Sequence, residues 1–179
     1  MSIVNSIEIV REWLDSTVCP MVQLKLPDDS ATDASYPYKL VNPTAFSLFV
    51  PSKDRLPPKV PAPIPSVCVQ IVEGTDSLTM SSRSIKIRLC FSAWDPGYHG
   101  RDIFKPKNDG SGAYVQWQNE EATAFFEKNG EGWRDAWNFV DTALRMIENA
   151  EYIGPLRVMK EDGITFGPVS EQDAVPDFY

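Results

Sequence analysis

The sequence feature that most limits the possible folds is a long run of alternating apolar and polar residues. In SIKIRLCFSAW, residues 84–94, apolar side chains alternate with more polar ones over the whole segment. A period of two is typical of a β-strand with one buried face. Residues 67–73 alternate in the same way, and the intervening GTDSLTMSSR, residues 74–83, is small and polar. The sequence therefore predicts a long antiparallel hairpin with a polar tip, in which Ile85, Ile87 and Leu89 lie beneath a helix.

Helical spacing occurs on both sides of this hairpin. Near the start, apolar residues recur at the intervals of a helix that Asn5 or Ser6 would cap and that Pro20 would stop: Ile3, Ile7, Val10 and Leu14. A clearer helix is predicted for residues 132–150. Its expected apolar stripe consists of Trp133, Trp137, Val140, Leu144 and Ile147, while Ala136 and Ala143 allow close approach to a sheet.

Shorter elements complete the predicted order. Strands are expected at residues 21–26 and 45–50, a short helix at 119–128, and a final hairpin around Asp162-Gly163, a pair that favours a type I′ turn. One helix before an antiparallel group of strands and one after it indicate an α+β fold. We expect a single two-layer domain over residues 1–179, with a mixed, mainly antiparallel sheet, two main helices packed on one face and long loop insertions.

Proline marks the first of two long insertions, which are expected at residues 27–65 and 95–118. The chain has 15 prolines in 179 residues, more than the average usage of about 5%. Residues 56–65 hold several of them close together, a pattern that favours an extended polyproline II rod. Because proline lacks the N–H that a sheet needs, we expect this rod at a sheet edge or in a connection.

The charge of the chain limits its partners. The net charge is −8, and the surplus of acidic residues lies wholly in residues 91–179. This balance argues against tight nucleic-acid binding, which needs a basic surface. The sequence has neither a long apolar run nor the cationic and apolar start of a signal peptide, so we expect no membrane span and no secretion by that route.

Residue types that carry catalysis are sparse. The single histidine, His99, has Arg101 and Asp102 nearby, but neighbours in sequence do not make a catalytic triad. There is no HExxH or CxxC motif, and residues 109–112 lack the lysine of a phosphate-binding loop. We therefore expect no enzymatic activity, no cofactor and no metal. The cysteines are interpreted as buried free thiols, since a disulfide would need two strands that happen to adjoin: Cys19, Cys68 and Cys90.

The order of the predicted elements resembles a known family. An amphipathic helix is followed by IPSVCVQIVEG, a polar tip, the alternating strand SIKIRLCFSAWD and the helix WRDAWNFVDTALRMIENA. In this order, and in the spacing of Pro65, Val67 and Val69, the chain resembles the lambda-type tail terminator proteins of long-tailed bacteriophages. LRVMKEDGITFGP is similar to the closing strands of prophage members. The resemblance covers chiefly residues 3–26, 65–94 and 132–168.

The resemblance implies a structural protein of the virion tail that is assembled in the cytoplasm of the bacterial host. Tail terminators form a ring, expected here to contain six copies, on the last ring of tail-tube subunits. This ring stops the growth of the tube and offers a surface for attaching the head. The implied partners are further copies of the chain, the tail-tube protein and a head–tail connector or neck protein, while DNA only passes through the channel.

Two groups of residues are expected to act in such a ring. The hairpin tip is predicted to contact the tail tube through Thr75, Asp76, Ser77, Leu78, Thr79, Met80, Ser81, Ser82 and Arg83. Acidic residues are predicted to face the channel, where lysines would retard DNA by binding its phosphates: Glu148, Glu151, Glu161 and Asp162. The proline-rich rod is expected either to cross a neighbouring subunit or the outer wall of the ring, or to cover the domain's own sheet edge.

Two other functions stay open as alternatives. The first is a neck or tail-completion protein that joins head and tail in the same particle. The second is a small metal-dependent hydrolase or nuclease without a local motif. Such an enzyme would need acidic residues or histidine gathered around a divalent metal ion.

Overall fold

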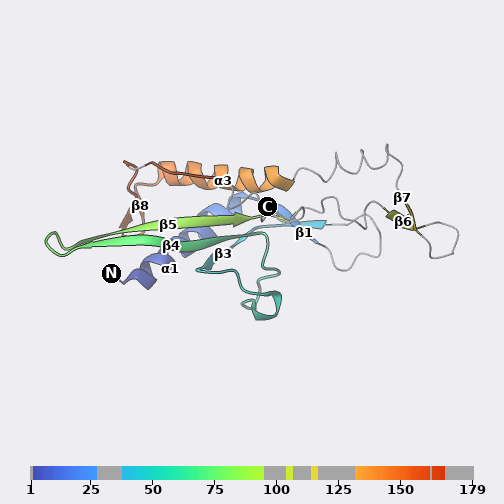
Figure 1. Cartoon of the computed structure of the whole chain (residues 1–179), viewed down its shortest axis with the longest axis horizontal. Coiled ribbons are helices and arrows are strands. Elements are labelled where there is room, and N and C mark those ends of the chain that lie inside the picture. Colours follow the sequence, from blue (N-terminus) through green and yellow to red (C-terminus); the bar gives the residue numbers. More distant parts are fainter. Residues whose placement is uncertain are drawn as a thin grey trace.

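The computed structural model of the chain describes residues 2–27, 38–94, 104–106, 114–116, 132–161 and 163–167 (Figure 1). Its elements form the predicted α+β fold, in which helices pack on a mixed sheet. The short helix predicted at 119–128 lies outside the described residues. So do residues 28–37 of the first predicted insertion and most of the second.

The predicted long hairpin is confirmed, and it is longer than expected. β4 (Ser66–Ser77) and β5 (Ser82–Ser92) pair antiparallel along their whole lengths. The connecting loop is therefore only residues 78–81, because the ladder continues through polar residues that the sequence suggested as a ten-residue tip. A bulge interrupts the register between Ile71 and Glu73, where one residue of β4 has no partner in β5. Such a bulge bends a strand and increases its local twist.

A third strand makes this sheet mixed. β3 (Thr44–Ser47) pairs parallel with the first residues of β4, from Thr44 opposite Ser66 to Ser47 opposite Val69. The strand predicted at 45–50 thus exists but ends at Ser47. It ends there because Leu48 adopts a left-handed backbone conformation, with φ of 67°, that turns the chain away from the sheet. Residues 48–65 then return to the start of β4 (Figure 1).

Shorter antiparallel pairs accompany the main sheet. β1 (Leu24–Pro27) pairs with β2 (Tyr38–Val41), β6 (Phe104–Pro106) with β7 (Tyr114–Gln116), and β8 (Tyr152–Ile153) with β9 (Leu156–Arg157). β1 overlaps the strand predicted at 21–26. Leu24 and Leu26, two residues apart on one face of β1, are both buried.

Both main helices pack on the same face of the sheet, as predicted. α1 (Ile3–Trp13) continues into a π-helix (Leu14–Val18) and a 3-10 turn (Cys19–Met21), and α3 spans Gly132–Asn149. Phe139 of α3 meets Phe91 of β5 edge to face, with ring centres 4.9 Å apart. Ile87 and Leu89 are partly buried against the shared core, whereas Ile85 is not part of it. The buried members of this core include Ile7, Val10, Leu14, Val67, Val69, Ala93, Phe139 and Ala143.

The N-cap of α1 differs from the prediction. Ser2 caps the helix, because its Oγ accepts a hydrogen bond from the backbone N–H of Asn5 at 3.1 Å. Ser6, one of the two predicted caps, is buried, and its own hydroxyl donates to the Ser2 carbonyl. The helix therefore starts at Ile3, whose side chain is exposed and lies outside the core.

The core-facing side of α3 also differs from the prediction. The residues in the core or packed against it follow one heptad-like stripe: Ala136, Phe139, Ala143, Met146 and Ala150. The predicted stripe lies one position further round the helix. Its described members are only half-buried or exposed: Trp137, Val140, Leu144 and Ile147. Ala136 and Ala143 both lie on this inner stripe, against the core.

The predicted C-terminal hairpin is wrong in its pairing. β9 pairs with β8 through a turn at Gly154, which has φ of 57° and lies so close to α1 that a Cβ atom there would come within 3.1 Å of Ile9 Cγ2. Residues 163–167 form no strand. Phe166 instead packs edge-on against Trp137 of α3, with ring centres 6.1 Å apart. Asp162, the other half of the predicted turn, lies outside the described residues.

The two stripes of α3 give a direct test of the packing. We expect Phe139→Ala to lower the free energy of unfolding by about 3–5 kcal/mol, because it removes a fully buried ring and leaves a cavity. Leu144→Ala, on the half-buried neighbouring stripe, should cost less than about 1.5 kcal/mol. Urea denaturation of both variants measures the difference. Equal losses would show that the helix presents the other stripe to the sheet.

Candidate functional site

The most conspicuous candidate site is the free half of the β4–β5 hairpin, residues 70–88, which we call the arm. β3 pairs only with the first four residues of β4, so beyond them the hairpin is a two-stranded ribbon among the described residues. Figure 1 shows this ribbon extending past both helices and past β8. A two-stranded ribbon with no layer packed on it is only marginally stable in water. The arm therefore depends on its root in the core for its position.

The arm tip holds the residues that the sequence predicted as the tail-tube contact. Thr75, Asp76 and Ser77 end β4, the loop is residues 78–81, and Ser82 and Arg83 begin β5. Within the loop, Ser81 has a left-handed φ of 51°, and the Ser77 hydroxyl accepts a hydrogen bond from the backbone N–H of Met80 at 3.3 Å. The tip is thus a defined turn held by its own short polar side chains.

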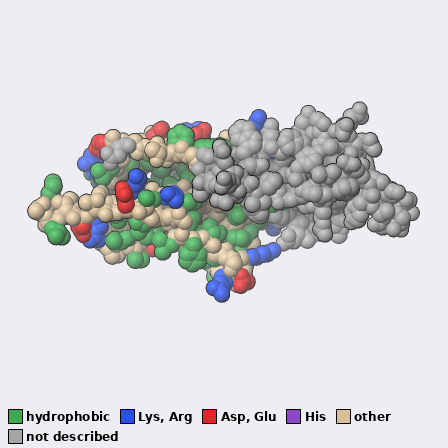
Figure 2. All heavy atoms as spheres, in the orientation of Figure 1, with side chains coloured by type: hydrophobic (Ala, Val, Ile, Leu, Met, Phe, Trp, Pro, Cys, Tyr) green, Lys and Arg blue, Asp and Glu red, His purple; other side chains and the backbone are tan. Residues whose placement is uncertain are grey.

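The arm tip also carries large apolar side chains in water. Leu78 is 90% exposed and Met80 is 78% exposed. Figure 2 shows hydrophobic side chains at the far end of the arm, away from the body of the molecule. Ile71 and Val72, at the bulge, are exposed as well. A projection that ends in such residues is typical of a contact surface, since apolar patches of this kind mark interaction sites.

Charged pairs fix the register of the arm. Arg83 donates to Asp76 across the hairpin, from its Nε at 3.2 Å. Lys86 lies 3.8 Å from Glu73, three residues nearer the body. All four side chains are partly exposed, so each pair contributes little stability. Their role is to favour this register, because they place opposite charges at facing strand positions and a slip of one residue would separate those charges.

A second apolar pair lies where β3 ends. Leu48 and Phe49 are both more than half exposed. The backbone N–H of Leu48 donates to the Val69 carbonyl at 2.8 Å, and the Leu48 carbonyl accepts from the Gln70 side chain at 3.2 Å. These contacts place the pair beside the root of the arm. The sequence reasoning missed this pair, because it assigned both residues to a strand and no local pattern indicated that the strand would stop.

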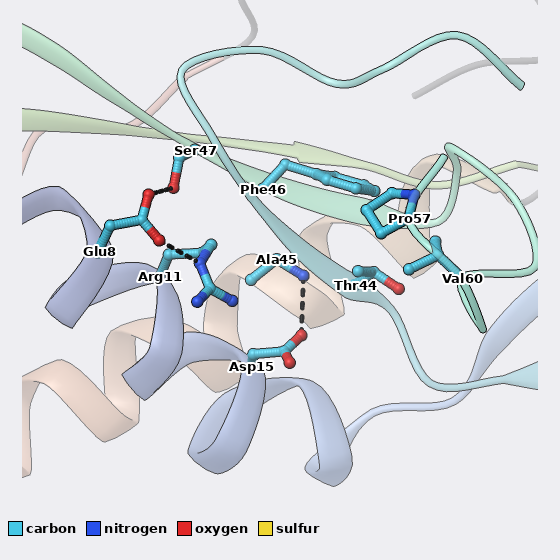
Figure 3. Close-up of a pocket in the computed structure, with 9 residues that line it drawn as sticks. All are labelled: Glu8, Arg11, Asp15, Thr44, Ala45, Phe46, Ser47, Pro57 and Val60. Carbon is cyan, nitrogen blue, oxygen red and sulfur yellow. Dashed lines mark hydrogen bonds and ion pairs between the residues drawn. The ribbon is translucent and has the colours of Figure 1, made fainter. Parts of the chain in front are cut away.

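A pocket of about 330 Å³ lies between α1, β3 and the proline-rich segment (Figure 3). Pro57 and Val60 line it on one side, and α1 and its π-turn line it on the other. The predicted straight polyproline rod is interrupted here by a turn, in which Val60 N–H donates to the Pro57 carbonyl at 3.1 Å and Lys59 has φ of 77°. The segment therefore bends back beside the domain's own edge strand. A contact with a neighbouring subunit stays a prediction.

The polar side chains of this pocket bind one another. Asp15 Oδ1 accepts from the backbone N–H of Ala45 at 3.1 Å, and Glu8 accepts from the Ser47 hydroxyl at 2.6 Å and from Arg11 Nε at 2.9 Å. The hydrogen bond from Ser47, and then that from Arg11, lower the pKa of Glu8 below its ordinary value. An ionised carboxylate held in this way does not suit a general acid. We interpret the group as a clamp that joins α1 to the exposed edge of β3.

The acidic residues predicted to face a channel gather at one end of α3. Glu148 is in its last turn, and Glu151 and Glu161 flank the β8–β9 hairpin; all three are exposed, while Asp162 lies outside the described residues. Basic residues lie among them. Arg157 donates to Glu161 at 2.9 Å, and Lys160 donates to the Glu148 carbonyl at 2.6 Å. The predicted acidic surface therefore also contains basic side chains.

Other features that bear on chemistry are few within the described part of the chain. No three His, Cys, Asp or Glu side chains there gather in a way that could hold a metal ion. No helix among the described residues is long and apolar enough to cross a membrane. The cysteines are free, as predicted; Cys19 and Cys68 are buried and Cys90 is half-buried. His99, Arg101 and Asp102 lie outside the described residues.

Comparison with known proteins adds no relative to this description. Neither a protein-family model, nor a curated protein, nor a solved structure matches the chain significantly.

The clamp between α1 and β3 predicts a pH dependence. Because the pKa of Glu8 is lowered in the folded protein, its contribution is present at neutral pH and is lost as the pH falls through that lowered pKa. Glu8→Gln should cost about 1 kcal/mol at neutral pH, since the carboxylate is partly exposed. The cost should vanish in acid. Urea denaturation at several pH values measures it.

Glu12→Gln is the matched control for this experiment. It removes the same charge from the same helix and also loses a contact to Arg11, but Glu12 does not reach β3. We expect a smaller loss for this variant at neutral pH. If both variants lost the same stability at every pH, the Ser47 hydrogen bond would have no part in holding β3.

Proposed function

We propose that the protein is a structural component of a long-tailed bacteriophage that caps the tail tube as a ring of identical copies, six in number. In this role it stops tube growth and presents the surface to which the head attaches. The proposal rests on the resemblance of residues 3–26, 65–94 and 132–168 to tail terminators. It is carried by one structural observation, the arm.

The arm suits a protein that works by contact. Its strands pair over their full length, but apart from Ile87, which packs against the core, its described residues lie outside the core, and its tip exposes Leu78 and Met80. These side chains gain no burial from the described parts of their own chain. Docking them on a neighbouring protein would remove apolar area from water, at about 25 cal/mol per Å². We assign the tail-tube contact to the tip and leave the pocket beside β3 as a structural joint.

The sheet edges suit assembly into a ring. Among the described residues, β5 pairs only with β4, and the arm portion of β4 pairs only with β5. Unpaired strand edges offer backbone donors and acceptors to another chain. The exposed Leu48 and Phe49 lie beside such an edge. We propose that neighbouring copies meet along this side, which would bury the pair.

A neck or tail-completion protein of the same particle is the competing proposal, because an arm with an apolar tip suits binding to the tail tube and to the head connector equally well. The two proposals differ in the partner that the tip recognises. A terminator should bind the end of purified tail tubes, whereas a neck protein should bind the connector of filled heads. Cosedimentation with each, followed by electron microscopy, separates them.

The tip contact predicts a specific loss of binding. The double variant Leu78→Asp, Met80→Asp should remain folded, since both side chains are in water, but should no longer sediment with tail tubes. Met159→Asp, Ile164→Asp is the matched control, because it changes two exposed apolar residues that are not part of the arm. We expect this control to bind normally. Wild-type binding by the tip variant, or equal loss in both, would overturn the assignment.

Ring formation predicts a discrete assembly. On tail tubes, or alone at high concentration, the chain should form closed rings of six, which native mass spectrometry and electron microscopy can count. Leu48→Asp, Phe49→Asp should weaken these rings without changing the melting temperature of the monomer. A chain that stays monomeric on tail tubes would contradict the ring.

The channel hypothesis predicts weak binding of DNA. The free protein should not retain duplex DNA at about 0.15 M salt, because a net charge of −8 per copy repels phosphates. Filter binding or fluorescence anisotropy measures this. Tight binding would contradict the channel hypothesis, and with it the predicted role of Glu148, Glu151, Glu161 and Asp162.

A further inference from the structure

Two of the three cysteines face each other across the root of the arm. Cys68 of β4 is the direct register partner of Cys90 in β5. Phe46 of β3 is the partner of Cys68 on its other side. Because Val67 and Val69 point into the helix-covered core, the alternation of the strand places Cys68 and Cys90 on the opposite face of the sheet.

The backbone geometry of this pair suits a disulfide. Residues directly opposite in an antiparallel ladder have Cα atoms about 4.5 or 5.5 Å apart, depending on the pair type. Both values lie within the range of about 4.4–6.8 Å that disulfides span. The preceding pair on the same face, Ser66 and Ser92, brings its hydroxyl oxygens within 3.3 Å of each other. Side chains on this face therefore meet across the strands.

The two thiols differ in access. Cys68 is 2% exposed, whereas Cys90 is half-buried and its Sγ lies 3.5 Å from the Gln70 side-chain oxygen. Burial, and to a lesser degree the neighbouring Cys90, raise the pKa of Cys68 to about 11. Burial also raises the pKa of Cys90. Both groups are therefore protonated at neutral pH, and a reagent from solution reaches Cys90 first.

We propose that Cys68 and Cys90 form a dithiol site that small-molecule disulfides oxidise to an internal cross-strand disulfide. The Cys90 thiolate attacks one sulfur of the small disulfide, breaks its S–S bond and releases one thiol. The Cys68 thiolate then attacks the Cys90 sulfur and releases the second thiol. The protein loses two electrons and two protons, and the small disulfide gains them as two thiols. The inference does not depend on the function proposed above.

This bond would tie the arm to the body at its root. It would close a loop that contains the whole arm, so the unfolded chain would lose conformational freedom. The oxidised protein should therefore be harder to unfold, and the strands at the root of the arm should separate less often. The oxidation state of the solution would then control how firmly the arm is held.

The test uses the full chain and oxidised glutathione as the probe. After incubation at about pH 8.5, where more thiolate is present, the acid-quenched and denatured protein should show one free thiol in place of three. Trypsin should yield peptide 60–83 linked to peptide 89–101. The melting temperature should rise by about 5–10 °C. Dithiothreitol should reverse all three changes.

Single variants identify the two sulfurs. Cys19→Ser should still form the linked peptides, because Cys19 is buried elsewhere. Cys68→Ser should stop at a stable glutathione adduct on Cys90, and Cys90→Ser should form no linked peptide. In the wild-type protein, which needs no variant to fold, a lasting adduct on Cys90, a link to Cys19 or the absence of any reaction would each overturn the proposal.

Discussion

The rest of the structure depends on the burial of the first four residues of β4. Ser66, Val67, Cys68 and Val69 are all nearly inaccessible to water, with β3 on one side, β5 on the other and two helices on one face. Described elements that are distant in sequence meet at this short segment: α1 through Val10, α3 through Phe139, and β3 through Ala45. The same strand then leaves the core and becomes the arm. One continuous strand thus serves both the folding of the protein and the contact that we propose.

The sequence predicted the parts of the fold that a single periodicity decides. Alternation alone was enough to pair β4 with β5 and to identify Leu89 and Ile87 as core-facing, because one side of each strand is apolar and the other is not. Periodicity could not decide which face of α3 packs on the sheet, because the helix has two adjacent apolar stripes. Only the tertiary context, in which Phe139 meets Phe91, selects the inner stripe.

Features that rest on backbone conformation or on distant partners were beyond the sequence. Leu48 ends β3 in a left-handed conformation that few non-glycine residues adopt, and no local pattern indicates it. The carboxylate of Asp15 finds the backbone of Ala45 only after folding. For the candidate site, the sequence predicted a tip that includes Leu78 and Met80, but it described that tip as polar and did not indicate that these two apolar side chains would be exposed. The facing of Cys68 and Cys90 was left open, because it depends on the register in which the two strands of the predicted hairpin pair.

The bulge in the arm has a consequence for how such a protein could change over evolution. Beyond Ile71 the direction of the ribbon is set by one extra residue on one strand. Losing that residue would straighten the ribbon and leave every other facing pair in place, while a second bulge would swing the tip further. Neither change touches the buried root. A lineage could thus re-aim the arm at a partner of altered shape by inserting or deleting single codons, and the residues of the core would stay unchanged.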